Sequence, residues 1–116
     1  MGTSGLIITP EHGPRVRLAA VLTNIENLPF GTHNAHAWIE DFCAQCGVCI
    51  RECPPQAIYD EPLRHKTGRI TCVDNDRCFP YFSDYHGCSV CIKVCPFNNT
   101  SYDKIKAGFQ RAKSRS

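Results

Sequence analysis

The sequence has 116 residues, with 13 lysines and arginines against 11 acidic residues, and it contains nine cysteines. A chain of this length fits one domain and buries only a small core, so covalent or metal cross-links would add stability. Its composition, 42% hydrophobic and 21% charged, excludes a disordered protein, and no apolar run is long enough to span a membrane.

The cysteine content indicates metal or redox chemistry. Residues 1–8 lack the basic region and the long apolar region of a secretory signal, so we expect a reducing, cytoplasmic location. A disulfide framework would also leave one of the nine cysteines unpaired. Metal or redox centres are therefore favoured over disulfides.

The charge is unevenly distributed along the chain. Residues 1–38 are neutral, residues 39–96 carry six basic and eight acidic side chains, and residues 97–116 carry five basic side chains against Asp103. The basic region is a local tail rather than a surface covering the whole protein, so no nucleic-acid partner is expected.

The N-terminal pattern predicts a β-hairpin. Residues 5–8 form a short apolar run, residues 10–14 are rich in turn formers, and residues 15–23 begin with alternating polar and apolar side chains. The end of the second strand is apolar on both faces, which suggests that a partner covers it. Residues 24–34 are expected to form a loop.

Two cysteine motifs follow and define an internal repeat. Residues 43–54 have the spacing C-x2-C-x2-C-x3-C-P, and residues 88–96 repeat it without the first cysteine. Aligning Cys46 with Cys88 gives six identical positions, as expected for a duplicated structural unit. Between the motifs we expect a turn over residues 62–68, a strand over 70–73 and a helix within 74–85 whose regular part Pro80 limits.

The tail predicts an amphipathic helix. Thr100 and Asp103 have the spacing of a capping box. Four apolar side chains then fall on one helical face: Tyr102, Ile105, Phe109 and Ala112. The simplest interpretation is a helix that docks on its own domain, and the alternative is a basic helix that binds a partner.

The cysteine spacing is typical of iron–sulfur clusters. Three cysteines at this spacing on a tight turn reach three corners of one cubane, and the fourth, followed by proline, reaches the other cluster, as in bacterial two-cluster ferredoxins. The pattern assigns Cys43, Cys46, Cys49 and Cys95 to cluster one. It assigns Cys53, Cys88 and Cys91 to cluster two, with Cys78 or Cys72 as the fourth ligand. Structural zinc usually takes two separated C-x2-C pairs, so it fits this pattern less well.

Other residues carry weaker signals. With eight thiolates and two oxidised clusters the net charge would become about −2, which suggests a basic partner surface. His33 and His36 have a spacing that suits a metal, although simple solvation in a loop is the favoured interpretation. We expect three aromatic side chains to shield cluster two from water: Tyr81, Phe82 and Tyr85. No catalytic constellation is recognisable.

Residues 77–98 resemble the second cluster motif of corrinoid-dependent reductases, namely the reductive dehalogenases and the epoxyqueuosine reductases. In those families the first cysteine is set well back from C-x2-C-x3-C-P, which an aromatic residue and asparagine follow. The matching residues here are Cys78, Cys88, Cys91, Cys95, Pro96, Phe97 and Asn98. The resemblance implies that Cys78 is the eighth ligand and that Cys72 is a small buried side chain. Residues 5–23 resemble the segment that closes the corrinoid-binding core in those families.

Together these features predict an α+β fold, a small two-cluster ferredoxin-like domain with an N-terminal β-hairpin and a C-terminal helix. We expect a hairpin and linker over residues 1–34, which docks a partner or is a remnant of a reductase core. A two-cluster domain over 35–100 and a basic helix over 101–116 follow. The corrinoid-binding part of the similar families has no counterpart in this sequence. We therefore expect electron transfer to a larger oxidoreductase or corrinoid protein, without catalysis by this chain. The alternative is a subunit or fragment that completes a corrinoid-dependent reductase and binds a corrinoid only with a partner.

Overall fold

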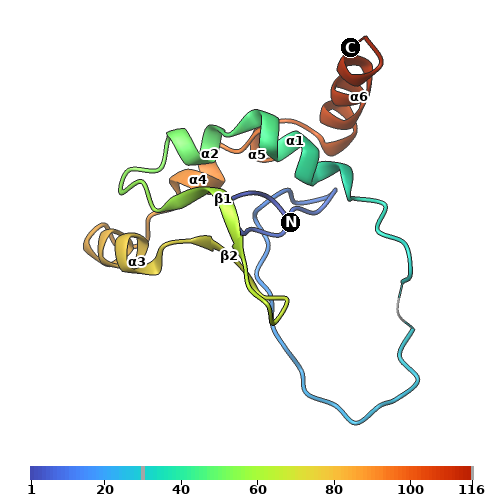
Figure 1. Cartoon of the computed structure of the whole chain (residues 1–116), viewed down its shortest axis with the longest axis horizontal. Helices are drawn as coiled ribbons and strands as arrows, with labels where there is room; N and C mark the ends of the chain where they lie inside the picture. The colour runs from blue at the N-terminus through green and yellow to red at the C-terminus, as the bar shows by residue number, and fades with distance from the viewer. Residues whose placement is uncertain (30, 116) are drawn as a thin grey trace.

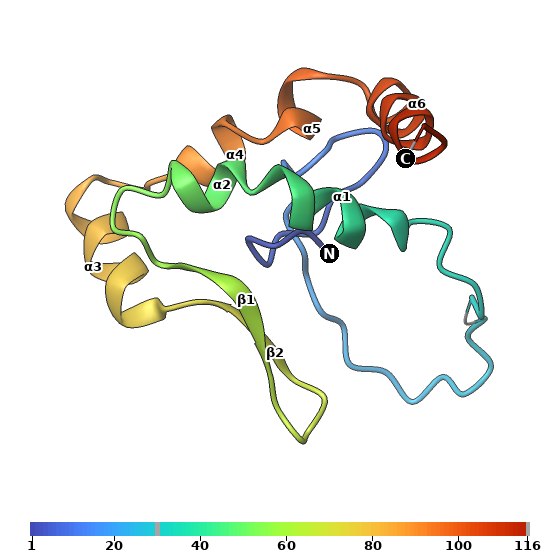
Figure 2. The same ribbon diagram turned by 45° about the horizontal axis from the view of Figure 1, so that its top comes forward.

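Short helices joined by loops lie beside a two-stranded sheet whose turn projects away from them (Figure 1). The computed structural model describes residues 1–29 and 31–115. The elements, in chain order, are α1 (Trp38–Cys46), α2 (Val48–Arg51), β1 (Ile58–Arg64), β2 (Ile70–Val73), α3 (Asn75–Asp84), α4 (Val90–Lys93), α5 (Pro96–Asn99) and α6 (Tyr102–Lys113). Helices α3 and α6 lie at opposite ends of the molecule, as both views show (Figure 2). Within the described ranges, no helix is long and apolar enough to cross a membrane.

The N-terminal region differs from the predicted β-hairpin. Thr9 and Gly13 form an isolated bridge, in which each backbone N–H donates to the other residue's carbonyl at 2.9 Å. Residues 15–23 have no strand partner among the described residues. A strand needs a neighbouring backbone to bond, and residues 5–8 do not supply one, because Gly5 turns the chain with a φ of 78° and Ile8 enters the core.

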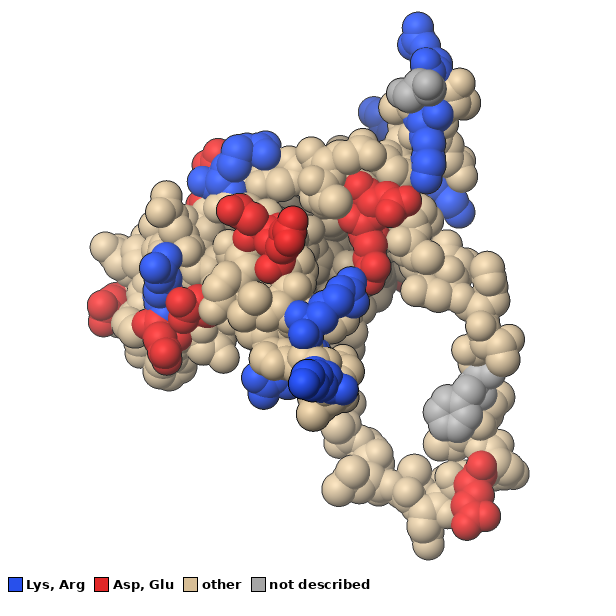
Figure 3. All heavy atoms as spheres, viewed as in Figure 1, with Lys and Arg blue, Asp and Glu red and all other residues tan. Residues whose placement is uncertain are grey.

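Residues 15–29, which we call the exposed arch, extend away from the rest of the chain. The space-filling view shows open space between this segment and the remainder of the molecule (Figure 3). The radius of gyration is 15.9 Å, compared with about 13 Å for a compact domain of this length. Leu22 is 98% exposed and Val21 is 85% exposed. The arch therefore presents apolar side chains that the described chain does not cover. Its residues 24–29 begin the predicted 24–34 loop, of which Phe30 lies outside the described residues.

The two-stranded sheet lies between the cysteine motifs. Strands β1 and β2 pair antiparallel, with a register shift between Ile58 and Leu63. The turn occupies residues 65–68, closed by a 2.9 Å bond from the Gly68 N–H to the His65 carbonyl, and is shorter than predicted. Pro62 belongs to β1 at the irregular part of the ladder, where its missing N–H is tolerated. The predicted strand over residues 70–73 is present as β2.

An aromatic core joins α1, α5 and α6. Five rings pack with centroid separations between 5.2 and 6.1 Å: Trp38, Phe42, Phe97, Tyr102 and Phe109. Such pairs contribute about 0.5–1.5 kcal/mol each beyond the area they bury. The Tyr102 hydroxyl accepts a 2.9 Å bond from Trp38 Nε1 and lies 2.6 Å from His36 Nδ1. The polar atoms at this end of the core are therefore paired.

Helix α6 docks on its own domain, as the amphipathic pattern predicts. Tyr102, Ile105 and Phe109 are buried, while Ala112 is exposed. The helix begins after Ser101, whose side chain makes no capping bond, so the predicted capping box from Thr100 to Asp103 is not formed. Packing of the aromatic face, rather than a side-chain cap, holds this helix.

Gly13 provides a test of how the N-terminal loop packs. Its φ is +57°, and a Cβ there would lie 2.2 Å from the Phe97 carbonyl oxygen. Gly68, with a φ of +82°, has no neighbour within 4 Å and serves as the matched control. We expect Gly68→Ala to cost about 1–2 kcal/mol through backbone strain alone and Gly13→Ala to cost about 3 kcal/mol or more.

The measurement is the midpoint of urea unfolding of each iron-loaded variant. Equal midpoints for the two variants would contradict the close packing of the loop on α5.

Candidate iron–sulfur centres

The two cysteine repeats fold into equivalent one-turn helices. In α2 the Arg51 N–H bonds the Gly47 carbonyl at 3.2 Å, and in α4 the Lys93 N–H bonds the Ser89 carbonyl at 3.0 Å. The Cys53 N–H donates to the Ile50 carbonyl, and the Cys95 N–H donates to the Ile92 carbonyl, both at 3.3 Å. Helices α2 and α4 also contact each other. The sequence repeat is therefore a repeat of backbone structure.

The first motif is more helical than predicted. Cys43 and Cys46 lie three residues apart at the end of α1, on one helical face, instead of on a tight turn. Gly47 ends α1 with a φ of 56°, and its N–H bonds the Cys43 carbonyl at 3.1 Å. The glycine thus interrupts the helix between Cys46 and Cys49, and Cys49, on α2, lines the same cavity as the first two cysteines.

Four of the predicted ligands share one cavity. Cys43, Cys46, Cys49 and Cys95 line it with the N-terminal loop and the core residues Ile8, Phe42 and Phe97. Burial is the main cause that raises the pKa of Cys95 to about 11, and the neighbouring thiols of Cys43, Cys49 and Cys46 add to it. Burial likewise raises the pKa of Cys43 and of Cys49. The predicted ligands of cluster one are therefore neighbours in space.

The remaining predicted ligands form a second group. Burial, followed by the thiols of Cys53 and Cys88, raises the pKa of Cys78. Burial also raises the pKa of Cys91, with contributions from Cys88, Cys49 and Cys53. Because Cys91 interacts with Cys49 as well, the two groups adjoin at this point.

Cys72 lies apart from both groups. It is 5% exposed on β2, and a Cβ on Gly5 would lie 3.2 Å from its own Cβ. Burial raises its pKa, and the positive charges of the N-terminus and Arg64 lower it in part. No other cysteine contributes to this pKa shift. Its surroundings match the expected small buried side chain.

Sequence reasoning missed several neighbours of the cysteines. The backbone and the hydroxyl of Thr3 hydrogen-bond Cys43, and the Ser4 hydroxyl hydrogen-bonds Cys49. Each of these three contacts lowers the pKa of the thiol concerned. The Ala57 N–H donates to the Cys53 Sγ at 3.4 Å. No motif marks these residues, because the N-terminal loop approaches the cysteines only in the folded chain.

Other predicted features divide between structural and site roles. His36 pairs with Tyr102, and His33 is exposed. Tyr81 stacks on Tyr85 with ring centroids 4.3 Å apart. Partial burial, then Tyr85 and the thiols of Cys88 and Cys53, raises the pKa of Tyr81, which places it beside the second group. Phe82 is 45% exposed and Tyr85 is 63% exposed, so Tyr81 is the better covered member of the predicted aromatic wall.

The cysteines do not form sites for single ions. All nine are free thiols. Across residues 1–29 and 31–115, no three cysteine, histidine or acidic side chains are placed to bind one metal ion. A cubane takes each thiolate at a different iron atom, so its ligands stand farther apart than those of one ion.

Comparison with known proteins identifies the family. The profile of the 4Fe-4S dicluster domain matches residues 42–106. The chain therefore belongs to the 4Fe-4S dicluster domain family, and its iron–sulfur character follows from that membership.

Several relatives are much longer reductases. The chain is 36% identical over 107 residues to the tetrachloroethene reductive dehalogenase of Sulfurospirillum multivorans, covering 80% of this chain and 20% of the relative. It is 35% identical to the trichloroethene reductive dehalogenase of Dehalococcoides mccartyi, in a match that covers 78% of this chain and 16% of the relative. It is 30% identical to the epoxyqueuosine reductase of Listeria monocytogenes, in a match that covers 84% of this chain and 26% of the relative. The chain thus spans about a fifth of these relatives. No solved structure matches it.

Two cysteine variants test the choice of the eighth ligand. We expect Cys78→Ser to degrade one cluster and spare the other, because the Cys78 thiol lies beside Cys53 and Cys88. Cys72→Ser is the control and should leave both clusters intact. Iron content and the electron paramagnetic resonance spectrum of each variant measure the outcome. Two intact clusters in Cys78→Ser together with a damaged cluster in Cys72→Ser would reverse the choice.

Proposed function

We propose that this chain transfers single electrons through two 4Fe-4S clusters to a larger oxidoreductase. The observation that supports the proposal best is the pair of adjoining cysteine groups, each with members from both repeats, that meet at Cys49 and Cys91. Two electron carriers held this close favour passage of an electron from one end of the domain to the other. Membership in the 4Fe-4S dicluster family supports the same interpretation.

The residues present fit such clusters. We assign Cys43, Cys46, Cys49 and Cys95 to cluster one, and Cys53, Cys78, Cys88 and Cys91 to cluster two. A bound 4Fe-4S cluster supplies one reversible electron at a potential that its protein surroundings set. Here the Ala57 N–H donates to the Cys53 sulfur, while Phe97 and Phe42 exclude water from the first group. These contacts are of the kind that hold and tune thiolate ligands.

The exposed arch supports a large partner. In the relatives about four fifths of the length lies outside this similarity, which supports a much larger protein region beside this domain. The apolar side chains of the arch are suited to that contact, by packing or by strand addition. The basic residues of α6 gather at the far end of the molecule (Figure 3), so the arch and the α6 end offer surfaces of different chemistry.

A second candidate function is a subunit or fragment that completes a corrinoid-dependent reductase. The names of the relatives favour it, as does the resemblance of residues 5–23 to the segment that closes a corrinoid-binding core. In this case the corrinoid would be bound mainly by the partner, and the chain would deliver electrons to it.

Metal analysis of the purified chain separates these candidates. After anaerobic reconstitution we expect about eight iron atoms and an equal amount of acid-labile sulfide per chain, with a reversible reduction signal. Tight uptake of cobalamin by the chain alone would favour the second candidate. About one zinc atom and no sulfide would contradict both.

A pair of substitutions tests whether the arch is independent of the cluster domain. Leu22 is 98% exposed, whereas Ile39 is 2% exposed in the core beside Cys43 and Cys95. We expect Leu22→Asp to retain full iron content and Ile39→Asp to lose most of it, because a buried unpaired carboxylate is strongly destabilising. Loss of iron in Leu22→Asp would show that the arch belongs to the chain's own core.

A further inference from the structure

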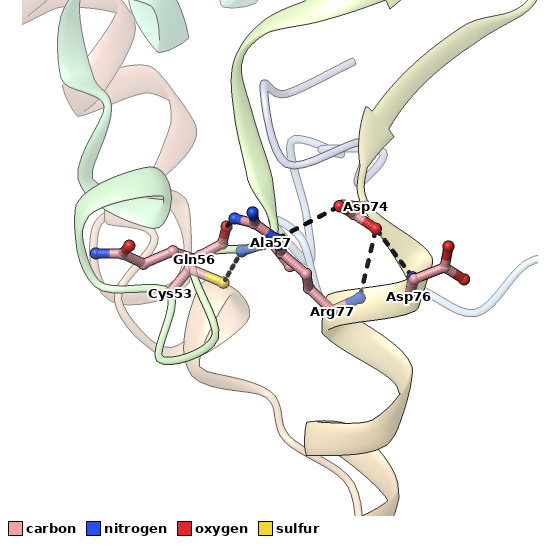
Figure 4. A network of polar contacts seen from close by, with 6 residues as sticks. All are labelled: Cys53, Gln56, Ala57, Asp74, Asp76 and Arg77. Atoms are coloured by element: carbon pink, nitrogen blue, oxygen red, sulfur yellow. Dashed lines mark hydrogen bonds and ion pairs between the residues drawn. The ribbon is translucent and has the colours of Figure 1, made fainter.

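The second cysteine group is assembled from two distant parts of the chain. Cys53 ends the first motif and is followed by the loop at residues 54–57, while Cys78 lies on α3. Two hydrogen bonds join these parts: the Asp74 N–H donates to the Ala57 carbonyl at 2.7 Å, and Arg77 Nη1 donates to the Gln56 carbonyl at 3.3 Å (Figure 4).

On the helix side, Asp74 fixes the turn that carries Cys78. Its Oδ1 accepts the N–H groups of Asp76 at 3.0 Å and Arg77 at 3.4 Å. Its own carbonyl accepts the Cys78 N–H at 2.9 Å. Asp74 is thus the N-cap of α3, and the cap sets the position of Cys78 one turn later.

On the loop side, the same contacts orient a donor toward Cys53. Gln56 has a φ of 49°, which a residue with a side chain rarely adopts. This conformation turns the next N–H, that of Ala57, toward the Cys53 Sγ at 3.4 Å. Arg77 bonds the Gln56 carbonyl and Asp74 bonds the Ala57 carbonyl, so both peptide groups of the unusual turn are held from α3 (Figure 4).

We propose that Asp74 and Arg77 are positioning residues that hold Cys78 and the Ala57 N–H in register around cluster two. We call them the Asp74–Arg77 clamp. The inference rests on the proposed function, since it requires Cys53 and Cys78 to bind a cluster. Their ion pair, 3.6 Å between Arg77 Nε and Asp74 Oδ2 with Arg77 63% exposed, is a weak surface contact, so the clamp acts through its hydrogen bonds to backbone groups.

The clamp has a direct consequence for the reduction potential. An N–H that donates to a ligand sulfur stabilises the additional negative charge of the reduced cluster and raises its potential. Releasing the turn would weaken this bond. Only the cluster that Cys53 and Cys78 bind would be affected, because the clamp contacts neither Cys43 nor Cys95.

The test compares substitutions on the same turn of α3. Asp74→Ala removes the cap, and Arg77→Ala removes the bond to Gln56. Asp74→Asn retains an oxygen that can cap the helix. Asp76→Ala removes an equal charge from the same turn and serves as the matched control. The full reconstituted chain is used for each variant, and redox titration followed by electron paramagnetic resonance gives the potential of each cluster. The rate of cluster loss to a chelator gives its stability.

For Asp74→Ala and for Arg77→Ala we expect the reduction potential of cluster two to become more negative, while that of cluster one stays unchanged. The affected cluster should be lost roughly fivefold faster, the factor that corresponds to one missing helix cap. Asp74→Asn and Asp76→Ala should behave nearly as the wild type.

Unchanged potentials and loss rates in both alanine variants would overturn the clamp, as would an equal shift in Asp76→Ala or an equal loss of both clusters. A wild-type chain that does not take up about eight iron atoms would instead overturn the proposed function, and the clamp with it.

Discussion

The fold depends on bringing cysteine thiols, whose ionised forms repel one another, together from distant parts of a short chain. Burial and neighbouring thiols raise the pKa of Cys95 to about 11, so the uncharged thiol is favoured until iron cations replace the proton. The core that opposes this cost is small and is made of isoleucine and aromatic side chains. We therefore expect cluster binding and folding to be coupled, because the small core alone would not order both cysteine groups.

The two cysteine groups are stabilised by different means. The first adjoins the aromatic core, and Cys43 and Cys95 pack directly against it. The second lies toward α3, whose residues are all exposed or only partly buried. It relies on hydrogen bonds from the Asp74 N–H and the Arg77 side chain to backbone carbonyls of the loop after Cys53. The two copies of the repeated backbone unit thus lie in different environments, the first apolar and the second polar. Differences in hydrogen bonding and solvent access are the properties that give two similar clusters different potentials.

The sequence predicts the centres better than the surrounding fold. Cysteine spacing reflects covalent geometry at the metal, which few alternative structures satisfy, so the repeat follows from the pattern. The spacing leaves Cys78 and Cys72 open, and the resemblance to corrinoid-dependent reductases singles out Cys78, which lies beside Cys53 and Cys88. The capping box at Thr100 fails because a local motif competes with the packing of Tyr102 and Phe109. Ala57 and Thr3 could not be predicted, since a backbone N–H carries no sequence signature and reaches its sulfur only through the tertiary fold.

The N-terminal error has a different physical cause. The alternation of polar and apolar residues over 15–23 indicates which side chains need to be buried. It does not indicate whether the residues that bury them belong to the same chain. Here the described chain offers none, and Leu18, Val21 and Leu22 remain exposed. A monomeric soluble domain rarely keeps such a run in water. The pattern therefore marks a surface that requires cover, and in the relatives about four fifths of the polypeptide lies outside this similarity.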